Sequence, residues 1–234
     1  MTTFYAEIIG TALMIILGNG VISNVLLKES KGYNSGWIVI ATGWGLAIAL
    51  PVALFASISG AQFNPAVTLS LATVGELSWS KVPMYIGAQT IGAFLGAFIV
   101  WLMYKPYFDK TDDSKEVLSC FSTVPAIRGH AGSFIAEVLG TFVLVFGALG
   151  IGAQKFSPGV SAALIGSIVW ALVLSLGGPT GCALNPTRDL MPRIAHTILP
   201  MKTKGNSDWS YAWIPIIAPI VGGILGAITY TSLF

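Results

Sequence analysis

Two Asn-Pro pairs are the residues of this chain whose type and spacing point most directly to chemistry. They open the triplets Asn64-Pro65-Ala66 and Asn185-Pro186-Thr187, which lie 121 positions apart. Asparagine is a strong helix N-cap, and proline suits the first helical position because its missing N–H would be unpaired there. Each pair therefore predicts the start of a helix with a positive dipole end and an asparagine amide that can donate hydrogen bonds.

The residues before each Asn-Pro pair predict irregular backbone. Gly60, Ala61 and Gln62 precede the first pair, and Thr180 and Gly181 precede the second. Inside a membrane such backbone is tolerated only where it is buried in protein or lines a water-filled path. We expect the carbonyls of these residues to line a path whose donor-rich centre opposes cations and protons but passes neutral solutes. The alternative is that Asn-Pro merely caps two ordinary helices.

Two carboxylates fall within apolar stretches, where ionisable residues are functional candidates. Glu7 and Glu137 belong to a repeated segment, because Ala-Glu-Ile-Ile-Gly-Thr at 6–11 returns as Ala-Glu-Val-Leu-Gly-Thr at 136–141. One hypothesis is that each carboxylate accepts hydrogen bonds from the irregular backbone before a half-helix. The other is a proton relay, which would make the protein a proton-coupled secondary transporter.

The elements that must position these residues are membrane helices. Of the 234 residues, 54% are hydrophobic and 9% are charged, and the mean hydropathy is +0.78. A typical soluble domain has about 25% charged residues, so the composition indicates an integral membrane protein. The segments 64–74 and 185–196 are too short to span and predict re-entrant half-helices. Stretches long enough to span lie near 4–27, 36–57, 82–104, 133–153, 159–177 and 210–233.

The second half of the chain repeats the first. Gly92 and Gly96 return 130 positions later as Gly222 and Gly226, like the segment that holds the two carboxylates. Each repeat, 1–104 and 133–234, has three spans and one half-helix, so the second copy crosses the membrane in the opposite direction. Such inverted repeats are typical of pores and transporters. We therefore predict a single channel domain made of two inverted repeats.

The linker between the repeats, residues 105–132, is the most polar stretch of the chain, and we expect it to be exposed to solvent. It holds Cys120, which we interpret as a lone loop thiol. The two cysteines do not have metal-ligand spacing, and the spans show no nucleophile–base or metal cluster, so we predict neither an enzyme nor a cofactor or metal site. The net charge of +2 does not suggest a nucleic-acid partner.

The residues around the two Asn-Pro pairs resemble the signature of the aquaporin superfamily, the major intrinsic proteins. Ser-Gly-Ala-Gln-Phe-Asn-Pro-Ala-Val-Thr at 59–68 is similar to the first family box, and Gly-Cys-Ala-Leu-Asn-Pro-Thr-Arg-Asp at 181–189 is similar to the second. The resemblance implies an all-α fold of six transmembrane helices plus two half-helices, with one pore per subunit of a homotetramer in the plasma membrane. Thr187 and Gln62 depart from the usual alanine and histidine.

The same resemblance places the chain in the glycerol-facilitator branch. Asp189 and Arg193 match the acidic and basic residues that mark this branch, and Pro215-Ile216 is similar to its pair in the last span. In this family the two intramembrane glutamates hold the pore loops, which implies that role for Glu7 and Glu137 here.

By resemblance, the selectivity filter maps to Trp44, Val173, Cys182 and Arg188. Arg188 supplies planar donors and repels cations, and Trp44 offers an apolar wall. Water-selective relatives usually have histidine at the Val173 position, and glycerol facilitators have phenylalanine at the Cys182 position, so we expect a wide filter. We infer passage of water, glycerol and similar polyols, urea, dihydroxyacetone, hydrogen peroxide and protonated lactic acid. The alternatives are a membrane-interface position for Trp44, a lipid-facing Val173 and a core-facing Cys182. The filter position assigned to Val173 could also fall one residue later, at Leu174.

Basic residues leave the orientation open. The family topology implies that both termini, with Lys81 and Lys155, lie in the cytoplasm and that eight other lysines and arginines lie on the opposite side. The positive-inside rule favours the reverse, but we follow the family topology. We interpret His130 and His196 as loop or interface residues rather than pH gates.

Overall fold

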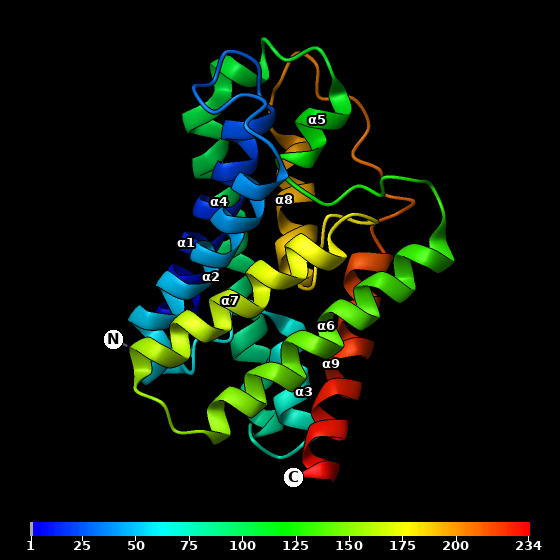
Figure 1. Ribbon diagram of the computed structural model, residues 1–234. Coiled ribbons are helices and arrows are strands. Elements are labelled where there is room, and N and C mark those ends of the chain that lie inside the picture. The colour runs from blue at the N-terminus through cyan, green and yellow to red at the C-terminus, as the bar shows by residue number, and fades with distance from the viewer. Residues whose placement is uncertain (1) are drawn as a thin grey trace.

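The computed structural model describes residues 2–234, and within that range the chain forms helices and no β-strand (Figure 1). All of the long helices are apolar enough to cross a membrane: α1 (Thr3–Leu26), α2 (Trp37–Ser59), α4 (Val82–Phe108), α6 (His130–Ala153), α7 (Pro158–Leu176) and α9 (Ile214–Leu233). The short helices are α3 (Pro65–Thr73), α5 (Ser114–Ser119) and α8 (Pro186–Ile198), with a 3-10 turn at Trp79–Lys81. The predicted spans and half-helices are confirmed.

The two repeats interlock through their half-helices. Within the first repeat α1 packs against α2 and α4, and within the second α6 packs against α7 and α9. Helices α2 and α7 join the two repeats along one face (Figure 1). Each half-helix packs mainly against the last span of the other repeat, α3 against α9 and α8 against α4. The two helix starts therefore approach each other inside the bundle rather than at its surface.

Glycines at matching positions allow the spans of each repeat to approach closely. A Cβ atom on Gly92 of α4 would overlap the carbonyl oxygen of Ile8 on α1. A Cβ atom on Gly222 of α9 would likewise overlap the carbonyl oxygen of Val138 on α6, and both members of this contact lie 130 positions after those of the first. Small residues at such contacts are how membrane helices pack without a hydrophobic driving force.

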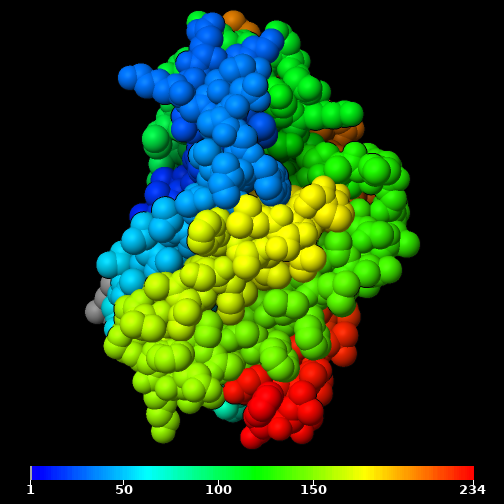
Figure 2. Space-filling model, in the orientation of Figure 1, coloured from blue at the N-terminus to red at the C-terminus, as the bar shows by residue number. Residues whose placement is uncertain are grey.

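The outer surface of the bundle is apolar. Figure 2 shows α7 lying across one face of the molecule, between α2 and α6. Its exposed side chains include Val160, Trp170 and Leu174, which are 46%, 42% and 41% exposed. Large apolar side chains exposed along a spanning helix suit the hydrocarbon of a bilayer and not water. The chain is a multi-pass membrane protein.

The linker differs from the sequence-based expectation. Helix α4 continues to Phe108, and the segment from Val117 to Thr123 is largely buried instead of exposed to solvent. Cys120 is completely buried, and this burial raises the pKa of its thiol to about 12. The expectation was wrong because the polar residues of the linker lie around α5, whereas its apolar residues, among them Phe121, fold back onto the bundle.

Candidate functional site

The first residues of α3 and α8 are linked through their cap asparagines. Asn64 Nδ2 donates to the carbonyl of Leu184 and Asn185 Nδ2 donates to the carbonyl of Phe63, each at 2.8 Å. Each Oδ1 accepts backbone N–H groups of its own half-helix, as expected of an N-cap. The remaining N–H of Asn64 has no acceptor within residues 2–234, and that of Asn185 faces only the Met14 thioether, at 4.0 Å. Both asparagines line one cavity, so these donors are open to a solute.

The backbone before each half-helix enters the left-handed region at alternate residues. The φ angle is 50° at Ala61 and Phe63, and it is 53° at Cys182 and 54° at Leu184. The second pair follows the first by 121 positions, as the asparagines do. Non-glycine residues in this region cost on the order of 1 kcal/mol or more each, so surrounding contacts must hold them.

Glu7 supplies those contacts for the first loop. Its Oε1 accepts hydrogen bonds from Ser59 Oγ at 2.6 Å and from the backbone N–H of Gln62 at 3.1 Å. Its Oε2 accepts from the backbone N–H of Phe63 and from Gln89 Nε2, each at 2.9 Å. A carboxylate has about four lone-pair positions, and Glu7 has a donor at each of them while it is completely buried.

Glu137 occupies the same position relative to the second loop. It accepts from Thr180 Oγ1 at 2.6 Å and from the backbone N–H groups of Ala183 at 2.9 Å and Leu184 at 2.8 Å. Like Glu7 it is completely buried. Both carboxylates therefore bind the residues that adopt or adjoin the left-handed conformation.

Two cavities approach these loops from opposite sides and share two wall residues. The inner cavity, of about 510 Å³, reaches from Pro158 at the start of α7 to the two asparagines. The outer cavity, of about 520 Å³, lies below the linker and is bordered by Trp37 and Ser122. Among residues 2–234 only Trp44 and Arg188 border both, so these two side chains separate the cavities.

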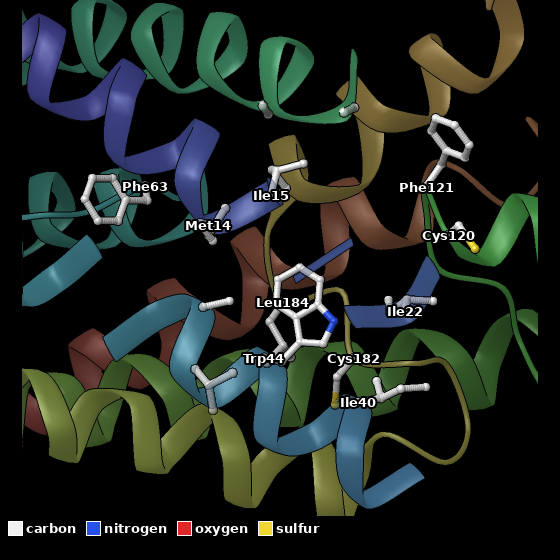
Figure 3. Packing of buried hydrophobic residues seen from close by; sticks show 14 of the residues in the cluster. Met14, Ile15, Ile22, Ile40, Trp44, Phe63, Cys120, Phe121, Cys182 and Leu184 are labelled. Carbon is white, nitrogen blue, oxygen red and sulfur yellow. The ribbon is translucent and has the colours of Figure 1, made fainter. Parts of the chain in front are cut away.

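The constriction between the cavities is bordered by a cationic and an aromatic side chain that lie against each other. The guanidinium carbon of Arg188 lies 4.4 Å from the ring centroid of Trp44, and Arg188 Nη1 donates to the carbonyl of Phe121 at 3.2 Å. Val173 and Cys182 both line the inner cavity, and Figure 3 shows Cys182 and Trp44 within the buried cluster. Trp44 is 7% exposed, which excludes a membrane-interface position, and the cavity places Val173 and Cys182 on its wall.

The remaining residues predicted to line the path are divided between the cavities. Gly60, Ala61 and Gln62 border the inner cavity, and Gly181 borders the outer one. Thr180 borders neither, and its hydroxyl is bound to Glu137. Within residues 2–234 no group of three or more His, Cys, Asp or Glu residues could hold a metal ion.

Asp189 and Arg193 lie behind the constriction instead of in it. They form an ion pair of 2.8 Å in which both side chains are completely buried. Asp189 Oδ2 accepts from the backbone N–H of Thr123 at 2.8 Å and from its hydroxyl at 2.6 Å. Arg193 donates to the carbonyls of Thr123 at 2.9 Å and Ser207 at 2.7 Å. The pair thus attaches two loops to α8.

Sequence reasoning missed the part that the linker plays at the constriction. The carbonyl of Phe121 accepts from Arg188 and also from Asn19 Nδ2 of α1, the latter at 3.0 Å. Asn19 is a completely buried polar residue inside a span, and that property was the available signal. Nothing in the polar composition of the linker indicated that Phe121 would contact α8.

Comparison with known proteins agrees with this architecture. A family model described as Major intrinsic protein matches residues 1–230. The chain is 56% identical to a probable glycerol uptake facilitator protein of Thermotoga maritima over the whole of both chains. It is 49% identical to the glycerol uptake facilitator protein of Bacillus subtilis, over all of this chain and 85% of that one. The aquaglyceroporin structure from Plasmodium falciparum superposes with a TM-score of 0.86 at 30% identity, covering 97% of this chain and 93% of the other.

These matches extend over almost the whole chain and include the helices that carry the cavities. Proteins of the matching family are channels and not enzymes. The inverted pair of half-helices, the crossed asparagines and the family match lead to one assignment: this chain belongs to the major intrinsic protein family, with glycerol uptake facilitators among its relatives.

Proposed function

We propose that this protein is a passive channel for glycerol and other small uncharged solutes, with Trp44, Val173, Cys182 and Arg188 as its selectivity filter. The observation that carries the proposal is the meeting of two cavities at Trp44 and Arg188, next to the paired asparagines. The names of the Thermotoga maritima and Bacillus subtilis relatives support glycerol as a substrate.

The constriction suits a polyol because a polyol is amphipathic. Arg188 presents N–H donors to the solute hydroxyl groups, and the part of the Trp44 ring that Arg188 does not cover presents an apolar surface to the carbon atoms. The second side-chain N–H groups of Asn64 and Asn185 then continue the row of donors into the inner cavity. A solute passing through them exchanges its hydration for these contacts without entering bare hydrocarbon.

Cations and protons meet a barrier at the same place. Arg188 is 3% exposed, and within residues 2–234 its side chain donates a hydrogen bond to a backbone carbonyl and not to a carboxylate. Its positive charge is therefore not neutralised by a direct partner. The N-termini of α3 and α8 add two positive dipole ends to the same region. Together these charges support exclusion of cations while leaving neutral solutes unaffected.

The filter is proposed to be wide because Cys182 and Val173 are small. The thiol of Cys182 is directed toward the carbonyl of Leu172, at 3.5 Å, so it lies along the cavity wall. This leaves room for urea, dihydroxyacetone and hydrogen peroxide as well as water. The same room supports protonated lactic acid as a further solute.

Coupling to protons is the competing function, and the surroundings of Glu7 argue against it. A relay needs a carboxylate that can take up and release a proton, but each lone-pair position of Glu7 already accepts a hydrogen bond from a protein donor. Glu137 is likewise bound to its loop. Both carboxylates are better suited to holding the loops than to moving protons.

We further propose a homotetramer with cytoplasmic termini in the plasma membrane. The exposed apolar faces of the spans would meet either lipid or neighbouring subunits. For the orientation, a protease added to one side of sealed cells or vesicles should cut the exposed part of the 105–132 linker only from the outside. Cleavage only from the cytoplasmic side would reverse the orientation.

The function is tested with the purified protein in liposomes. Stopped-flow light scattering at about pH 4 should show that glycerol, urea and lactic acid enter liposomes with the protein faster than they enter empty liposomes. An imposed proton gradient should not make these solutes accumulate inside. Uphill accumulation would instead establish a coupled transporter. Absence of glycerol entry would exclude the proposed channel.

The filter is tested with Cys182→Phe. The phenyl ring would occupy space on the cavity wall, so entry of the bulkier lactic acid should slow several-fold more than entry of glycerol. Leu54→Phe places the same ring on the exposed surface of α2, away from both cavities, and serves as the matched control. Equal slowing of all solutes by Cys182→Phe would mean that Cys182 does not set the width.

A further inference from the structure

The inner cavity has a polar side chain that the proposed filter does not use. Its wall is mostly apolar, with Ile48, Val52, Leu71 and Leu144 among its residues. Gln62 borders this apolar region and is only partly buried, whereas its repeat-related residue in the second loop is Ala183. The amide of Gln62 therefore has no counterpart in the other loop.

A chain of hydrogen bonds determines how this amide is turned, and it begins at Glu7. Gln89 Nε2 donates to Glu7 Oε2 at 2.9 Å and to Thr68 Oγ1 at 3.0 Å. The opposite orientation of the Gln89 amide would place its oxygen against a carboxylate oxygen, which is repulsive. The amide nitrogen of Gln89 must therefore face both groups, and its two N–H bonds serve one each.

The hydroxyl of Thr68 in turn determines the orientation of the Gln62 amide. Because its oxygen already accepts from Gln89, the hydroxyl proton of Thr68 points elsewhere. The shorter contact is with Gln62 Oε1, at 2.6 Å, compared with 3.1 Å to the carbonyl of Asn64. Thr68 is completely buried, so water does not compete for its proton. The oxygen of the Gln62 amide thus accepts from Thr68, and the amide nitrogen is left without a hydrogen-bond acceptor within residues 2–234.

We propose that the side-chain NH2 group of Gln62 is a binding site for solute oxygen atoms in the inner cavity, and that Glu7, Gln89 and Thr68 hold it in the donor orientation. Gln62 Nε2 has no acceptor within residues 2–234. This inference rests on the proposed channel function and adds a specificity-determining residue to it. Thr68 is a positioning residue, because it acts through Gln62.

The site favours polyols over water for a physical reason. Water molecules in a wide cavity can hydrogen-bond to one another, so they lose little when one wall donor is removed. A glycerol molecule displaces those waters with its carbon atoms, and its hydroxyl oxygens then depend on the donors of the wall. The Gln62 donor should therefore change glycerol permeability more than water permeability.

The direct test is Gln62→Met, assayed for glycerol and water entry in the same liposomes. Methionine has a similar length and keeps the backbone N–H that Glu7 binds, but it has no donor. The ratio of glycerol to water permeability should fall about threefold to tenfold, the loss expected for one hydrogen bond. Gln62→Leu replaces this variant if the methionine protein does not fold.

The role of Thr68 in holding the Gln62 amide is tested with Thr68→Val, which preserves the shape of the side chain and removes its hydroxyl. The amide of Gln62 then loses its anchor, so the glycerol-to-water ratio should fall in the same direction as for Gln62→Met. Ser70→Ala is the matched control, because this buried hydroxyl of the same half-helix donates only to the carbonyl of Ala66. Ser70→Ala should leave the ratio unchanged.

The outcomes separate this inference from the channel function. If wild-type liposomes do not admit glycerol, the proposed function itself fails. If wild type admits glycerol but folded Gln62→Met or Gln62→Leu protein has an unchanged ratio, the Gln62 site is wrong and the channel stands. If Thr68→Val and Ser70→Ala change the glycerol-to-water ratio equally, Thr68 does not hold the Gln62 amide and the proposed site is wrong. This comparison tests the proposal even if neither Gln62 variant folds.

Discussion

The two loops that carry the asparagines use the same carboxylate support but different anchors behind it. The first loop is held from α4, where Tyr85 donates to the carbonyl of Ser59 at 2.6 Å and Gln89 donates to Glu7. The residues 130 positions later in α9 are Pro215 and Pro219, which have no polar side chain. The second loop therefore lacks these anchors from its own last span.

The second half-helix is held instead by a charged pair and by the linker. Arg188, Asp189 and Arg193 follow Val67, Thr68 and Ala72 by 121 positions, so the repeat replaces uncharged residues with charged ones. Asp189 and Arg193 bind the linker at Thr123, and the linker offers a carbonyl to Arg188. The asparagines and glutamates that both repeats share form the pore. The charged residues found only in the second half-helix place the constriction on one side of it.

The largest expected effect is on this charged anchor. Asp189→Asn leaves Arg193 buried without its carboxylate, which should lower the free energy of unfolding by about 3 kcal/mol or more. Thr68→Val, at the repeat-related position, removes only hydroxyl hydrogen bonds and should cost about 1 kcal/mol. Thermal unfolding of the two detergent-solubilised variants measures the difference. Equal losses would mean that the two half-helices are anchored with equal strength.

The shared carboxylates provide the second test. Glu7→Gln and Glu137→Gln each place an NH2 group against backbone and hydroxyl donors, and each should destabilise the protein by roughly 2 to 3 kcal/mol. The loss should be greater for Glu7, which accepts four hydrogen bonds, than for Glu137, which accepts three. Thermal unfolding in one detergent ranks them. A larger loss for Glu137 would contradict the comparison of the two loops.

Arg188→Val gives the second half-helix the residue that the first has at Val67. Removing this charge should raise cation conductance several-fold and lower the preference for glycerol over other neutral solutes of similar size. Stability should change little, because the variant removes a buried charge that has no carboxylate partner. Conductance across planar bilayers and solute entry into liposomes measure the two changes. Unchanged cation exclusion would mean that the dipoles of the half-helices, and not Arg188, form the barrier to cations.

The smallest effect is expected at the ion pair between the linker and the 199–213 loop. Partial burial raises the pKa of Asp208, but hydrogen bonds from Arg128, at 2.8 Å, and from Ser210 outweigh it, so the pKa lies below its ordinary value. The pair therefore stabilises the folded state above the unfolded pKa of about 3.9 and loses this effect as the pH falls through the lower folded value.

Asp208→Asn should accordingly lower the melting temperature slightly at pH 7. The difference from wild type should shrink as the pH is lowered below about 3.9. Melting curves of both proteins over this range provide the measurement. A difference that grows toward low pH would mean that Asp208 destabilises the fold.

The spans and half-helices were predictable because lipid imposes strict rules on a chain. Helices of sufficient length and apolar composition are required to cross the bilayer, and Asn-Pro is a local signal for a helix start. The positions of Glu7 and Glu137 were equally accessible, because a charge inside an apolar span and a repeat at a constant offset are both visible in one dimension. These signals depend on near neighbours or on periodicity.

The linker was not predictable in the same way. The carbonyl of Phe121 meets Arg188 across 67 positions and Asn19 across 102, and no composition or periodicity encodes such contacts. Backbone carbonyls are present at every residue, so the sequence does not distinguish the one that orients an arginine. The polar residues of α5 made the linker as a whole look solvent-exposed, although the apolar residues that follow α5 are buried.

The sequence by itself therefore determined that this protein crosses the membrane as an inverted repeat and that each repeat holds one asparagine-capped half-helix. Only the tertiary structure decided where the path narrows, because the constriction between Trp44 and Arg188 combines α2, α8 and a linker carbonyl. It also decided which way the Gln62 amide is turned, because a chain of hydrogen bonds from Glu7 through Gln89 and Thr68 sets that orientation. Local patterns specify helices, whereas direction and width arise from contacts between residues far apart in the chain.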